Sequence, residues 1–352
     1  MMASKTYLTG GIGAHHSDEA FGDPYELPNE RSYCETCAAI SSIMFSWRML
    51  MITGEAKYAD LMERTLYNGF LAGLSLDGQR YIYANPLQVR EGHIARGDDG
   101  DYQRVEWFHC ACCPPNVMRT LASLEHYVLL GSGARVVLHQ YMTGRYAAGV
   151  ANGEVWLEVA TDYPWDGTVT IRVAGAPAGR WELAVRVPHW AEQPRLTVNG
   201  TAVDTAPADG WWAVGREWNE GDEVLLVLPL EPRFTVADPR LDAARGAVAV
   251  EYGPLVYCLE AVDNPKHRLD DITVDPAVAP KAVSVDATLG GAATIRTAGR
   301  VRPRSDTLWW PYHPADALAG DEPGESVALT AVPYYTWGNR EPGAMRIWVP
   351  IA

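Results

Sequence analysis

Apolar residues repeat at helical spacing only in the first third of the chain. Between residues 40 and 51 they recur at intervals of three and four until Thr53-Gly54 interrupts the pattern, which predicts one amphipathic helix. A second helix is predicted over 58–70. A third is predicted over 117–128, because a Pro-Pro-Asn start precedes that stretch and a Gly-Ser-Gly sequence follows it. Each helix has one broad apolar stripe and therefore needs a partner to cover it.

From about residue 134 the hydrophobic period changes to two, which is typical of β-strands. The pair Asn199-Gly200 between two short apolar stretches predicts a tight hairpin. A second β-rich stretch follows a seam near 231–233, and no repeat of fixed period links the two stretches. We therefore expect two antiparallel β-sandwich modules after the helical segment. The segments with the clearest strand character are 154–159, 169–173, 181–187, 223–227, 246–259, 282–285, 294–296 and 327–335.

The length of 352 residues allows two or three domains with an ample hydrophobic core. Apolar residues make up 47% of the chain, yet no unbroken apolar run approaches the ~18 residues that a membrane span needs. The first eleven residues contain no apolar segment of the kind found in secretory signal peptides. We therefore expect a soluble globular protein in the cytoplasm.

The chain carries 29 basic and 44 acidic residues, a formal net charge of −15. Such a surface repels nucleic acid and anionic lipid, so neither a nucleic acid nor a membrane is an expected partner. Among the aromatic residues, 13 Trp and 17 Tyr stand against 5 Phe. Flat rings with polar edges suit surfaces that stack against sugars, but Trp and Tyr also fill the cores of β-sandwiches. The excess of Trp and Tyr over Phe is therefore compatible with a sugar-binding protein but is not specific evidence for one.

Five of the six cysteines lie in two tight clusters, at 34–37 and at 110–113. In a chain without a signal peptide, clustered thiols indicate metal ligands or catalytic groups rather than disulfides. Zinc is the natural ion for such a site, because thiolates are soft ligands and three or four of them with a carboxylate complete a tetrahedron. Cys258, within a strand-like stretch, is expected to be a small buried residue.

Spacing alone leaves the choice of ligands open. One alternative is a structural four-cysteine zinc site formed by Cys34, Cys37 and two of Cys110, Cys112 and Cys113. Both clusters also lie where a helix is predicted to begin. Thiols at a helix N-terminus beside a bound dication are expected to be ionised at neutral pH, which would make them reactive.

Two carboxyl groups lie near the first cysteine cluster, and each of them can be interpreted either as structural or as part of a reactive site. Ser32 and Glu35 have the S-x-x-E spacing of a capping box, in which Glu35 would bond back to the Ser32 amide instead of binding a metal. Glu19 follows a glycine-rich stretch over 10–13 that lacks the Gly-Lys-Ser/Thr ending of a phosphate loop. A partly desolvated Glu19 could act as a general acid, whereas an isolated loop carboxylate is usually solvated.

Taken together, the motifs resemble glycoside hydrolase family 127, the β-L-arabinofuranosidases. Five motifs carry the resemblance in the first third of the chain, and two more extend it essentially to the end. Their order and spacing make a chance match improbable. The motifs are Glu19 to Gly22, Tyr25 to Asn29, Tyr33 to Ile40, Tyr83 to Leu87, Cys110 to Asn116, Gly253 to Tyr257 and Pro333 to Arg340.

The resemblance implies a retaining glycosidase whose nucleophile is a zinc-bound cysteine. By motif match, Zn²⁺ would be held by Glu35, Cys37, Cys112 and Cys113. Cys112 would attack the anomeric carbon, and Glu19 would act as the acid and base in turn.

The resemblance also bears on the residues around these groups. Tyr83 would line the sugar pocket, while Cys34 and Cys110 would be neighbours of the site. For Trp107 and His109, which precede the nucleophile, a packing role is at least as well supported as a role in the site.

The resemblance further implies how the chain is divided. Members of this family build the catalytic domain as an (α/α)6 barrel of twelve helices, whereas this chain shows about three clear helices. We therefore expect a multidomain α + β protein, a partial (α/α)6 barrel followed by two antiparallel β-sandwich modules. Residues 1–130 would be the second half of the barrel, 131–233 one β-sandwich and 234–352 the other. Helical stripes left exposed by the missing half would favour a homodimer or a complementing chain.

Three hypotheses follow for the function. The first is an active zinc-thiolate arabinofuranosidase acting on arabinofuranoside-containing oligosaccharides. The second is a non-catalytic, zinc-stapled carbohydrate-binding or truncated remnant of such an enzyme. The third is a thiol-redox protein that uses Cys34 and Cys37, which is disfavoured because no thioredoxin-like alternation of strands and helices surrounds them.

Overall fold

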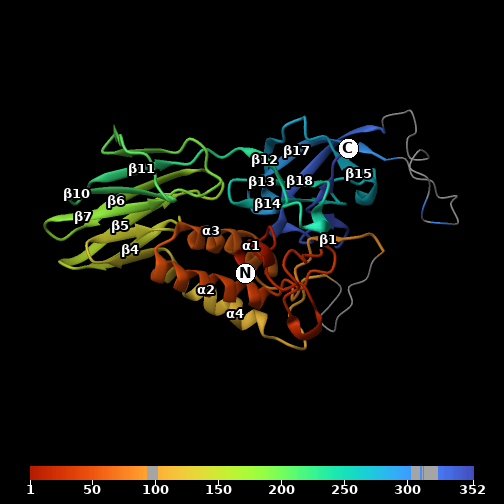
Figure 1. Ribbon diagram of the computed structural model, residues 1–352, viewed down its shortest axis with the longest axis horizontal. Coiled ribbons are helices and arrows are strands. Elements are labelled where there is room, and N and C mark those ends of the chain that lie inside the picture. Colours follow the sequence, from red (N-terminus) through yellow and green to blue (C-terminus); the bar gives the residue numbers. More distant parts are fainter. Residues whose placement is uncertain (93–101, 303–309, 311, 313–323) are drawn as a thin grey trace.

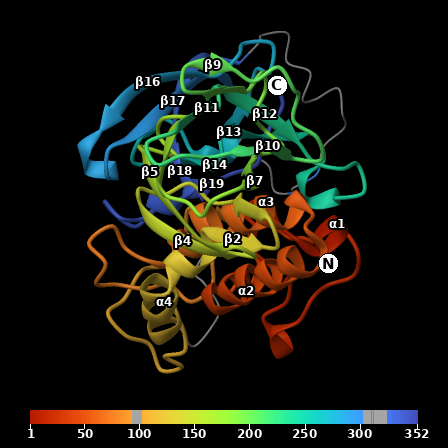
Figure 2. The same cartoon turned by 90° about the vertical axis from the view of Figure 1, so that its left-hand side faces the viewer.

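A computed structural model describes residues 1–92, 102–302, 310, 312 and 324–352. Its chain forms a helical part, a middle part made of two sheets and a C-terminal part made of one large sheet (Figure 1). Seen from the end of its long axis, the molecule has α2 and α4 along one side and the sheets stacked on the other (Figure 2). The architecture is thus a mixed one, with few helices and many strands.

The helical part occupies the first 130 residues or so. Helix α2 ends where Thr53-Gly54 predicts, because Gly54 adopts φ 72 and donates its backbone N–H to the Leu50 carbonyl. The α-helices are α1 (Met2–Lys5), α2 (Thr36–Thr53), α3 (Ala56–Arg64) and α4 (Cys113–Ala122). The shorter helical turns of this part are η1 (Ser17–Glu19), the π-helix η2 (Thr65–Phe70), η3 (Leu71–Gly73) and η4 (Leu124–Tyr127). The C-terminal part contains the short turns η5 (Asp242–Ala244), η6 (Leu269–Asp271), η7 (Ala287–Leu289) and η9 (Tyr334–Thr336).

Two of the predicted helices end differently from the expectation. The second, predicted over 58–70, is α-helical only to Arg64 and continues as the π-helix η2. The third, predicted to reach 128, ends at Ala122, because Ser123 leaves helical geometry and 129–132 form a strand. An apolar stripe at helical spacing cannot separate a helix from a 3-10 turn that leads into a strand, which explains the second error.

The middle part consists of two sheets whose inner faces share one apolar core. The Asn199-Gly200 hairpin is confirmed, since β8 and β9 pair across it and both turn residues have positive φ. One expectation is wrong: β3 and β7 pair in parallel, so this part is not purely antiparallel. Its strands are β2 (Leu129–Ser132), β3 (Arg135–Leu138), β4 (Gly144–Val150), β5 (Gly153–Thr161), β6 (Thr168–Gly175), β7 (Arg180–Arg186), β8 (Arg195–Val198), β9 (Thr201–Ala202), β10 (Trp211–Glu217) and β11 (Glu223–Val227).

The C-terminal part differs from the expected sandwich of two separate sheets. Its strands join into one sheet, which also takes in β1 from the helical part through pairing with β19. The sheet is curled (Figure 1), and every residue of β14 is buried. Its buried side chains belong to two apolar clusters, one shared with the middle part and one shared with the helical part. Its strands are β1 (Gln88–Val89), β12 (Pro232–Val236), β13 (Ala247–Tyr252), β14 (Leu255–Glu260), β15 (Ile272–Val274), β16 (Lys281–Asp286), β17 (Ala292–Val301), β18 (Ser326–Pro333), β19 (Met345–Arg346) and β20 (Val349–Pro350).

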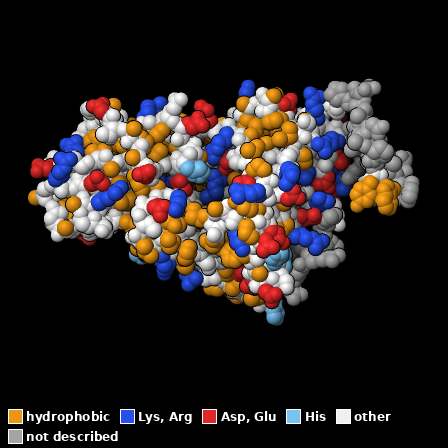
Figure 3. All heavy atoms as spheres, in the orientation of Figure 1, with side chains coloured by type: hydrophobic (Ala, Val, Ile, Leu, Met, Phe, Trp, Pro, Cys, Tyr) orange, Lys and Arg blue, Asp and Glu red, His pale blue; other side chains and the backbone are white. Residues whose placement is uncertain are grey.

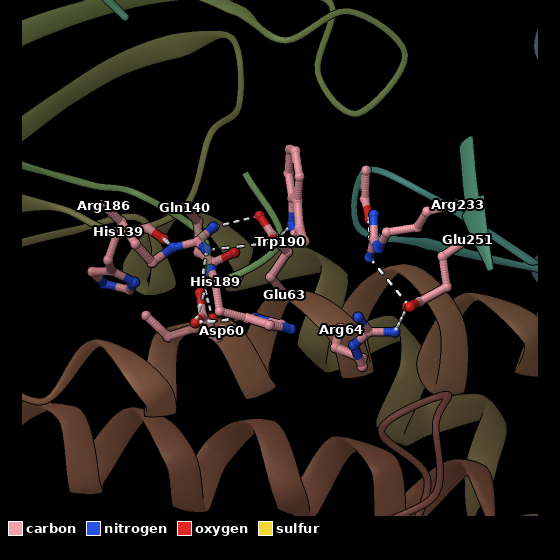
Figure 4. A network of polar contacts seen from close by, with 12 residues as sticks. Asp60, Glu63, Arg64, His139, Gln140, Arg186, His189, Trp190, Arg233 and Glu251 are labelled. Atoms are coloured by element: carbon pink, nitrogen blue, oxygen red, sulfur yellow. Dashed lines mark hydrogen bonds and ion pairs between the residues drawn. The ribbon is translucent and has the colours of Figure 1, made fainter. Parts of the chain in front are cut away.

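A buried ion network joins helix α3 to the middle part (Figure 4). The guanidinium of Arg186, at the end of β7, is fully buried and donates to Asp60 at 2.6 Å and to Glu63. Its Nε donates to the His139 carbonyl at 2.7 Å, and Glu63 also accepts from the Trp190 indole at 3.3 Å. Since both carboxylates come from one helix and the cation from a strand, the network sets where α3 sits on the sheets.

The same helix is tied to the C-terminal sheet by two further contacts. Arg64 pairs with the buried Glu251 of β13, which also accepts from Arg233 at 3.2 Å (Figure 4). In the π-helix, the Asn68 amide donates to the Pro254 carbonyl at 3.0 Å and accepts from the Val256 backbone at 2.7 Å. The helical segment is therefore held by both β parts, which gives the residues it carries a defined position.

Arg186→Met is expected to lower the free energy of unfolding by about 3–5 kcal/mol, because it leaves Asp60 and Glu63 as buried charges without their cation. The shift of the urea unfolding midpoint measures this loss. Arg172→Met is the control, because Arg172 pairs with Glu223 on an exposed face and should cost at most about 1 kcal/mol. Equal losses in the two variants would show that the buried network does not stabilise the fold.

One side of the helical part exposes apolar side chains. They belong to α2 and α4, and hydrophobic atoms gather at the lower edge of the molecule where these helices lie (Figure 3). By length and composition α2 is also apolar enough to span a membrane, with a mean hydropathy of 1.3 over 18 residues. A core helix passes the same test, and α2 packs on α3, η2 and α4, so no membrane assignment follows. The exposed side chains are Phe45, Met51, Ile52, Met118 and Leu121.

Candidate active site

Two segments that are about fifty residues apart lie side by side at the start of α2. The Thr36 backbone N–H donates to the Tyr83 carbonyl at 3.0 Å, and Glu35 forms an isolated β-bridge with Ala84. The buried Asn85 amide secures this pairing by donating to the Cys34 carbonyl at 2.9 Å. Tyr83 is thereby placed next to the first cysteine motif.

The second cysteine motif reaches the first through the packing of α4 on α2. Cys37 lies in the first turn of α2, while Cys112 and Cys113 begin α4. The Asn116 amide, one turn into α4, donates to Cys37 Sγ at 2.9 Å. Two helix N-termini therefore point at the same place, and their partial positive charge favours anionic ligands there.

Glu35, Cys37, Cys112 and Cys113 present their ligand atoms within 4.8 Å of one another. Glu35 Oε1 lies 3.2 Å from Cys112 Sγ and 3.9 Å from Cys113 Sγ. Cys113 Sγ lies 3.5 Å from Cys37 Sγ and 3.7 Å from Cys112 Sγ. Among the residues that the structure describes, no other group of this kind could hold a metal ion.

These spacings fit a tetrahedral ion. Zinc bonds of about 2.3 Å to sulfur and about 2.1 Å to oxygen separate two sulfurs by about 3.8 Å and a sulfur from an oxygen by about 3.6 Å. The observed sulfur–sulfur separations of 3.5 and 3.7 Å lie slightly below the first value, and the sulfur–oxygen separations of 3.2 and 3.9 Å lie on either side of the second. Three sulfurs and one carboxylate oxygen also form the soft donor set that zinc accepts. The residues present therefore fit the group that the motifs imply.

The electrostatics of the cluster also call for a cation. Burial and the hydrogen bond with Glu35 raise the pKa of the Cys112 thiol, and the contact with Cys37 and burial raise that of Cys113. The hydrogen bonds that Cys37 shares with Cys113 and Asn116 lower its pKa. Without a positive charge, three thiols this close cannot all ionise, whereas a bound dication would let them do so.

Glu19 is connected to this cluster by two phenols. Its Oε1 accepts from the Tyr83 hydroxyl at 3.2 Å, and the Tyr83 hydroxyl lies 2.9 Å from that of Tyr33. The Tyr33 hydroxyl in turn lies 3.2 Å from Glu35 Oε2. Burial raises the pKa of both phenols, so each keeps its hydrogen. One chain of hydrogen bonds thus runs from the loop carboxyl to the metal-ligand cluster.

The backbone conformation of the loop places the Glu19 carboxyl next to Tyr83 in this chain of hydrogen bonds. Asp18 and Glu19 both adopt positive φ, at 58 and 52, a conformation that is uncommon for residues other than glycine. Upstream, Gly13 at φ 98 lies so close to the Tyr33 ring that a Cβ there would come within 3.2 Å of it. The glycine-rich stretch therefore lets the loop lie on the Tyr33 segment, and the exposed Glu19 is not an isolated solvated carboxylate.

Several residues near the cysteine motifs lie outside the group. Cys34 is buried with its side chain away from the other sulfurs, next to Gly11, and Cys110 is exposed. All six cysteines are free, and Cys37 contacts Cys113 rather than Cys34, which gives no support to a redox pair at 34–37.

Trp107 and His109 are exposed, so neither has the packing role considered for it. Phe108 between them is buried and packs edge-on against Tyr83, with ring centroids 5.8 Å apart.

The capping-box alternative for Glu35 is not realised. Glu35 is itself the N-cap of α2, and its carboxylate faces the thiols and Tyr33 while the Ser32 hydroxyl bonds to backbone carbonyls. Two residues of the site escaped the sequence analysis, Tyr33 and Asn116. Both lie within the motifs themselves, and a polar side chain two positions before Glu35 or four after Cys112 was the available signal.

Zn²⁺ is expected to raise the melting temperature of the chain by about 5 °C at a concentration a hundred times its Kd, because it binds only the folded cluster. Calorimetry of chelator-treated protein, with and without added Zn²⁺, measures the shift. Cys37→Ser should lose most of it, and Cys110→Ser, which changes an exposed thiol outside the cluster, should keep it. An unchanged melt after chelation and after zinc addition would contradict a metal site here.

Three descriptions from one family match the chain in succession. "Beta-L-arabinofuranosidase, GH127 catalytic domain" matches residues 1–126, and "Beta-L-arabinofuranosidase, GH127 middle domain" matches 135–230. "Glycoside hydrolase family 127 C-terminal domain" matches 232–350. Between them the three cover nearly the whole chain, in the order of the helical, middle and C-terminal parts.

Individual relatives agree with these matches. The chain is 38% identical over 366 residues to a "Non-reducing end beta-L-arabinofuranosidase" of Bifidobacterium longum subsp. longum, covering 99% of this chain and 54% of that protein. A crystal structure of a GH127 β-L-arabinofuranosidase from Geobacillus stearothermophilus T6 superposes with a TM-score of 0.89 at 35% identity, over 99% of this chain and 55% of that one. A GH127 β-arabinofuranosidase structure gives 0.87 at 34%, over 99% and 54%. The chain thus spans about half the length of these relatives.

Proposed function

Since this chain belongs to glycoside hydrolase family 127, we propose that it carries the acid/base and metal–thiolate machinery of a retaining β-L-arabinofuranosidase. The substrate would be an oligosaccharide that ends in a β-L-arabinofuranosyl unit. One observation carries the proposal: Glu19 and the cluster of Glu35, Cys37, Cys112 and Cys113 are linked by hydrogen bonds although they come from separate segments. A structural zinc staple would have no need of a carboxyl group joined to it.

In the first step, Cys112 Sγ attacks the anomeric carbon while Glu19 donates its proton to the glycosidic oxygen. The carbon–sulfur bond forms as the carbon–oxygen bond breaks, and the aglycone leaves as an alcohol. Glu19 remains as a carboxylate beside a covalent thioglycosyl enzyme. In the second step that carboxylate removes a proton from water, whose oxygen displaces the sulfur and releases the sugar with its anomeric configuration retained.

The other residues prepare these two steps. Glu35, Cys37, Cys112 and Cys113 would hold Zn²⁺, whose chemistry is to keep the sulfurs ionised at neutral pH. Asn116 supports the cluster through its hydrogen bond to Cys37 Sγ. Tyr83 keeps the Glu19 carboxyl in place and would border the sugar.

A second candidate is a non-catalytic, zinc-stapled form of the same fold. It is favoured by the exposed apolar side chains of α2 and α4. A helical segment on that side, from a further stretch of chain, a second copy or another protein, would cover those side chains. On this alternative, zinc binds and sugar binding survives loss of Glu19, but no glycoside is cleaved.

Hydrolysis of p-nitrophenyl β-L-arabinofuranoside by the full chain, reduced and loaded with zinc, tests the proposal. Turnover above that of the Cys112→Ser variant is the expected result. A folded, zinc-loaded chain without turnover would favour the non-catalytic alternative. A chain that binds no zinc would overturn both.

A further inference from the structure

The Tyr33 hydroxyl lies where the two halves of the site meet. Tyr33 is 5% exposed, and its hydroxyl has two oxygens within hydrogen-bond distance, Glu35 Oε2 at 3.2 Å and the Tyr83 hydroxyl at 2.9 Å. Its ring is fixed by edge-on contacts with His16 and Tyr83, whose centroids lie 5.2 and 5.9 Å away. The position of the hydroxyl is therefore set by packing before any metal or substrate binds.

The two oxygens of Glu35 have different partners. Oε1 faces Cys112 and Cys113, while Oε2 faces Tyr33. A carboxylate whose outer oxygen is held cannot rotate away, so Tyr33 determines that Oε1 is the oxygen offered to the cluster. Partners of this kind, one shell out from the ligands, commonly contribute 10- to 100-fold to metal affinity.

The number of hydrogens available along the hydrogen-bond chain connects the orientation of Glu35 to the protonation of Glu19. Three contacts link Glu19, Tyr83, Tyr33 and Glu35, but the two phenols supply only two hydrogens. When Glu19 is ionised it takes the hydrogen of Tyr83, and the Tyr33 hydrogen can fill only one of the two remaining contacts. When Glu19 carries a proton, a third hydrogen is present, all three contacts are filled and Tyr33 donates to Glu35. The change needs only hydroxyl rotation and breaks no covalent bond.

We propose that Tyr33 is a positioning residue: it orients the ligand carboxylate of Glu35 and, through Tyr83, makes the metal cluster respond to the state of Glu19. The inference rests on the proposed function of Glu19 and Glu35, but the metal cluster alone is enough to test it. When Glu19 loses its proton in the first step of the reaction, the hydrogen bond from Tyr33 to Glu35 would weaken. The metal cluster would therefore change before the second step, in which the sulfur of Cys112 is displaced from the sugar.

Titration with Co²⁺, followed by its thiolate charge-transfer absorption, tests the orienting role in the full chain. Tyr33→Phe keeps the ring and is expected to raise the Kd for Co²⁺ by about 10- to 100-fold. Tyr83→Phe should bind Co²⁺ with nearly unchanged affinity, because Tyr33 is then free to donate to Glu35. Tyr257→Phe removes a hydroxyl that is bonded to the Ala293 carbonyl in the C-terminal sheet and is the matched control. Wild-type affinity in Tyr33→Phe would overturn the orienting role.

A double-mutant cycle tests the connection to Glu19. Glu19→Gln is expected to change the Kd for Co²⁺ by a factor that differs at least about twofold between the wild-type and the Tyr83→Phe backgrounds. Through-space effects of the lost charge act in both backgrounds and cancel. An equal change in both would overturn the relay. If the wild-type chain binds no Co²⁺, the metal cluster itself is refuted. If it binds Co²⁺ normally but cleaves no sugar, only the proposed activity is contradicted.

Discussion

Replacing Cys112 by serine is expected to lower kcat/KM for p-nitrophenyl β-L-arabinofuranoside by at least about 10⁴-fold, because the variant loses the nucleophile and one ligand together. Serine has the same shape, but its hydroxyl stays protonated at neutral pH and is a poor ligand for zinc. Initial rates with reduced, zinc-supplemented protein measure the loss. Intact-mass analysis of the wild type during turnover should show one added pentosyl group, absent from the variant.

Cys110→Ser is the matched control for this result. Cys110 is two residues away, exposed and outside the cluster, so its variant should keep the wild-type rate within about threefold, as surface changes usually do. Substantial turnover by Cys112→Ser would exclude Cys112 as the nucleophile and leave it a structural ligand at most. Equal losses in both variants would point to general damage at the start of α4.

Glu19→Gln is expected to slow cleavage of alkyl or sugar aglycones by about 10²- to 10⁴-fold, because the amide can neither donate nor accept the proton. The loss should be smaller with p-nitrophenol as the leaving group, since it departs without protonation. Azide should then restore product formation as a glycosyl azide, because it attacks the thioglycosyl carbon without a general base. Steady-state rates with the two classes of aglycone measure this difference.

Asp18→Asn is the control for Glu19. Asp18 precedes it in the same turn and also has positive φ, but its carboxylate contacts only the Ser17 hydroxyl, at 3.4 Å, among the hydrogen bonds of the described residues. Its variant should therefore behave like the wild type with both aglycones. A Glu19→Gln enzyme equally slow with every leaving group and not rescued by azide would argue that Glu19 positions the loop rather than transferring protons.

Much of the fold follows from rules that act over a few residues. Gly54 ends α2 because a left-handed residue can cap a helix, and Asn199-Gly200 forms a hairpin because both residues tolerate positive φ. The parallel pairing of β3 with β7 could not be predicted in this way. Alternation of apolar residues identifies a strand and its buried face, but it does not name the neighbour, and about 45 residues separate these two strands.

In the candidate site, too, some features could be predicted from the sequence and others could not. Motif matches point to Glu19, Glu35, Cys37, Cys112 and Cys113, and the structure brings these residues together. Cys34 is as close in sequence, yet its backbone adopts positive φ, at 37, and its buried side chain lies next to Gly11 while Glu35 faces the cluster. The role of Tyr33 depends on how its hydroxyl meets residues of three segments, which no spacing reveals.

The family, the chemical types in the site and the local elements can be read from the amino-acid sequence, because these depend on residue identity and on neighbours within one or two turns. The three-dimensional packing establishes which oxygen of Glu35 faces the thiols, how Glu19 is joined to them and that a short strand from the helical part pairs with the C-terminal sheet. Those outcomes depend on contacts between residues 50 to 260 positions apart, within a helical segment that the ion pairs of Arg186 and Arg64 hold on both β parts. Packing across such separations selects among many arrangements that local preferences allow equally.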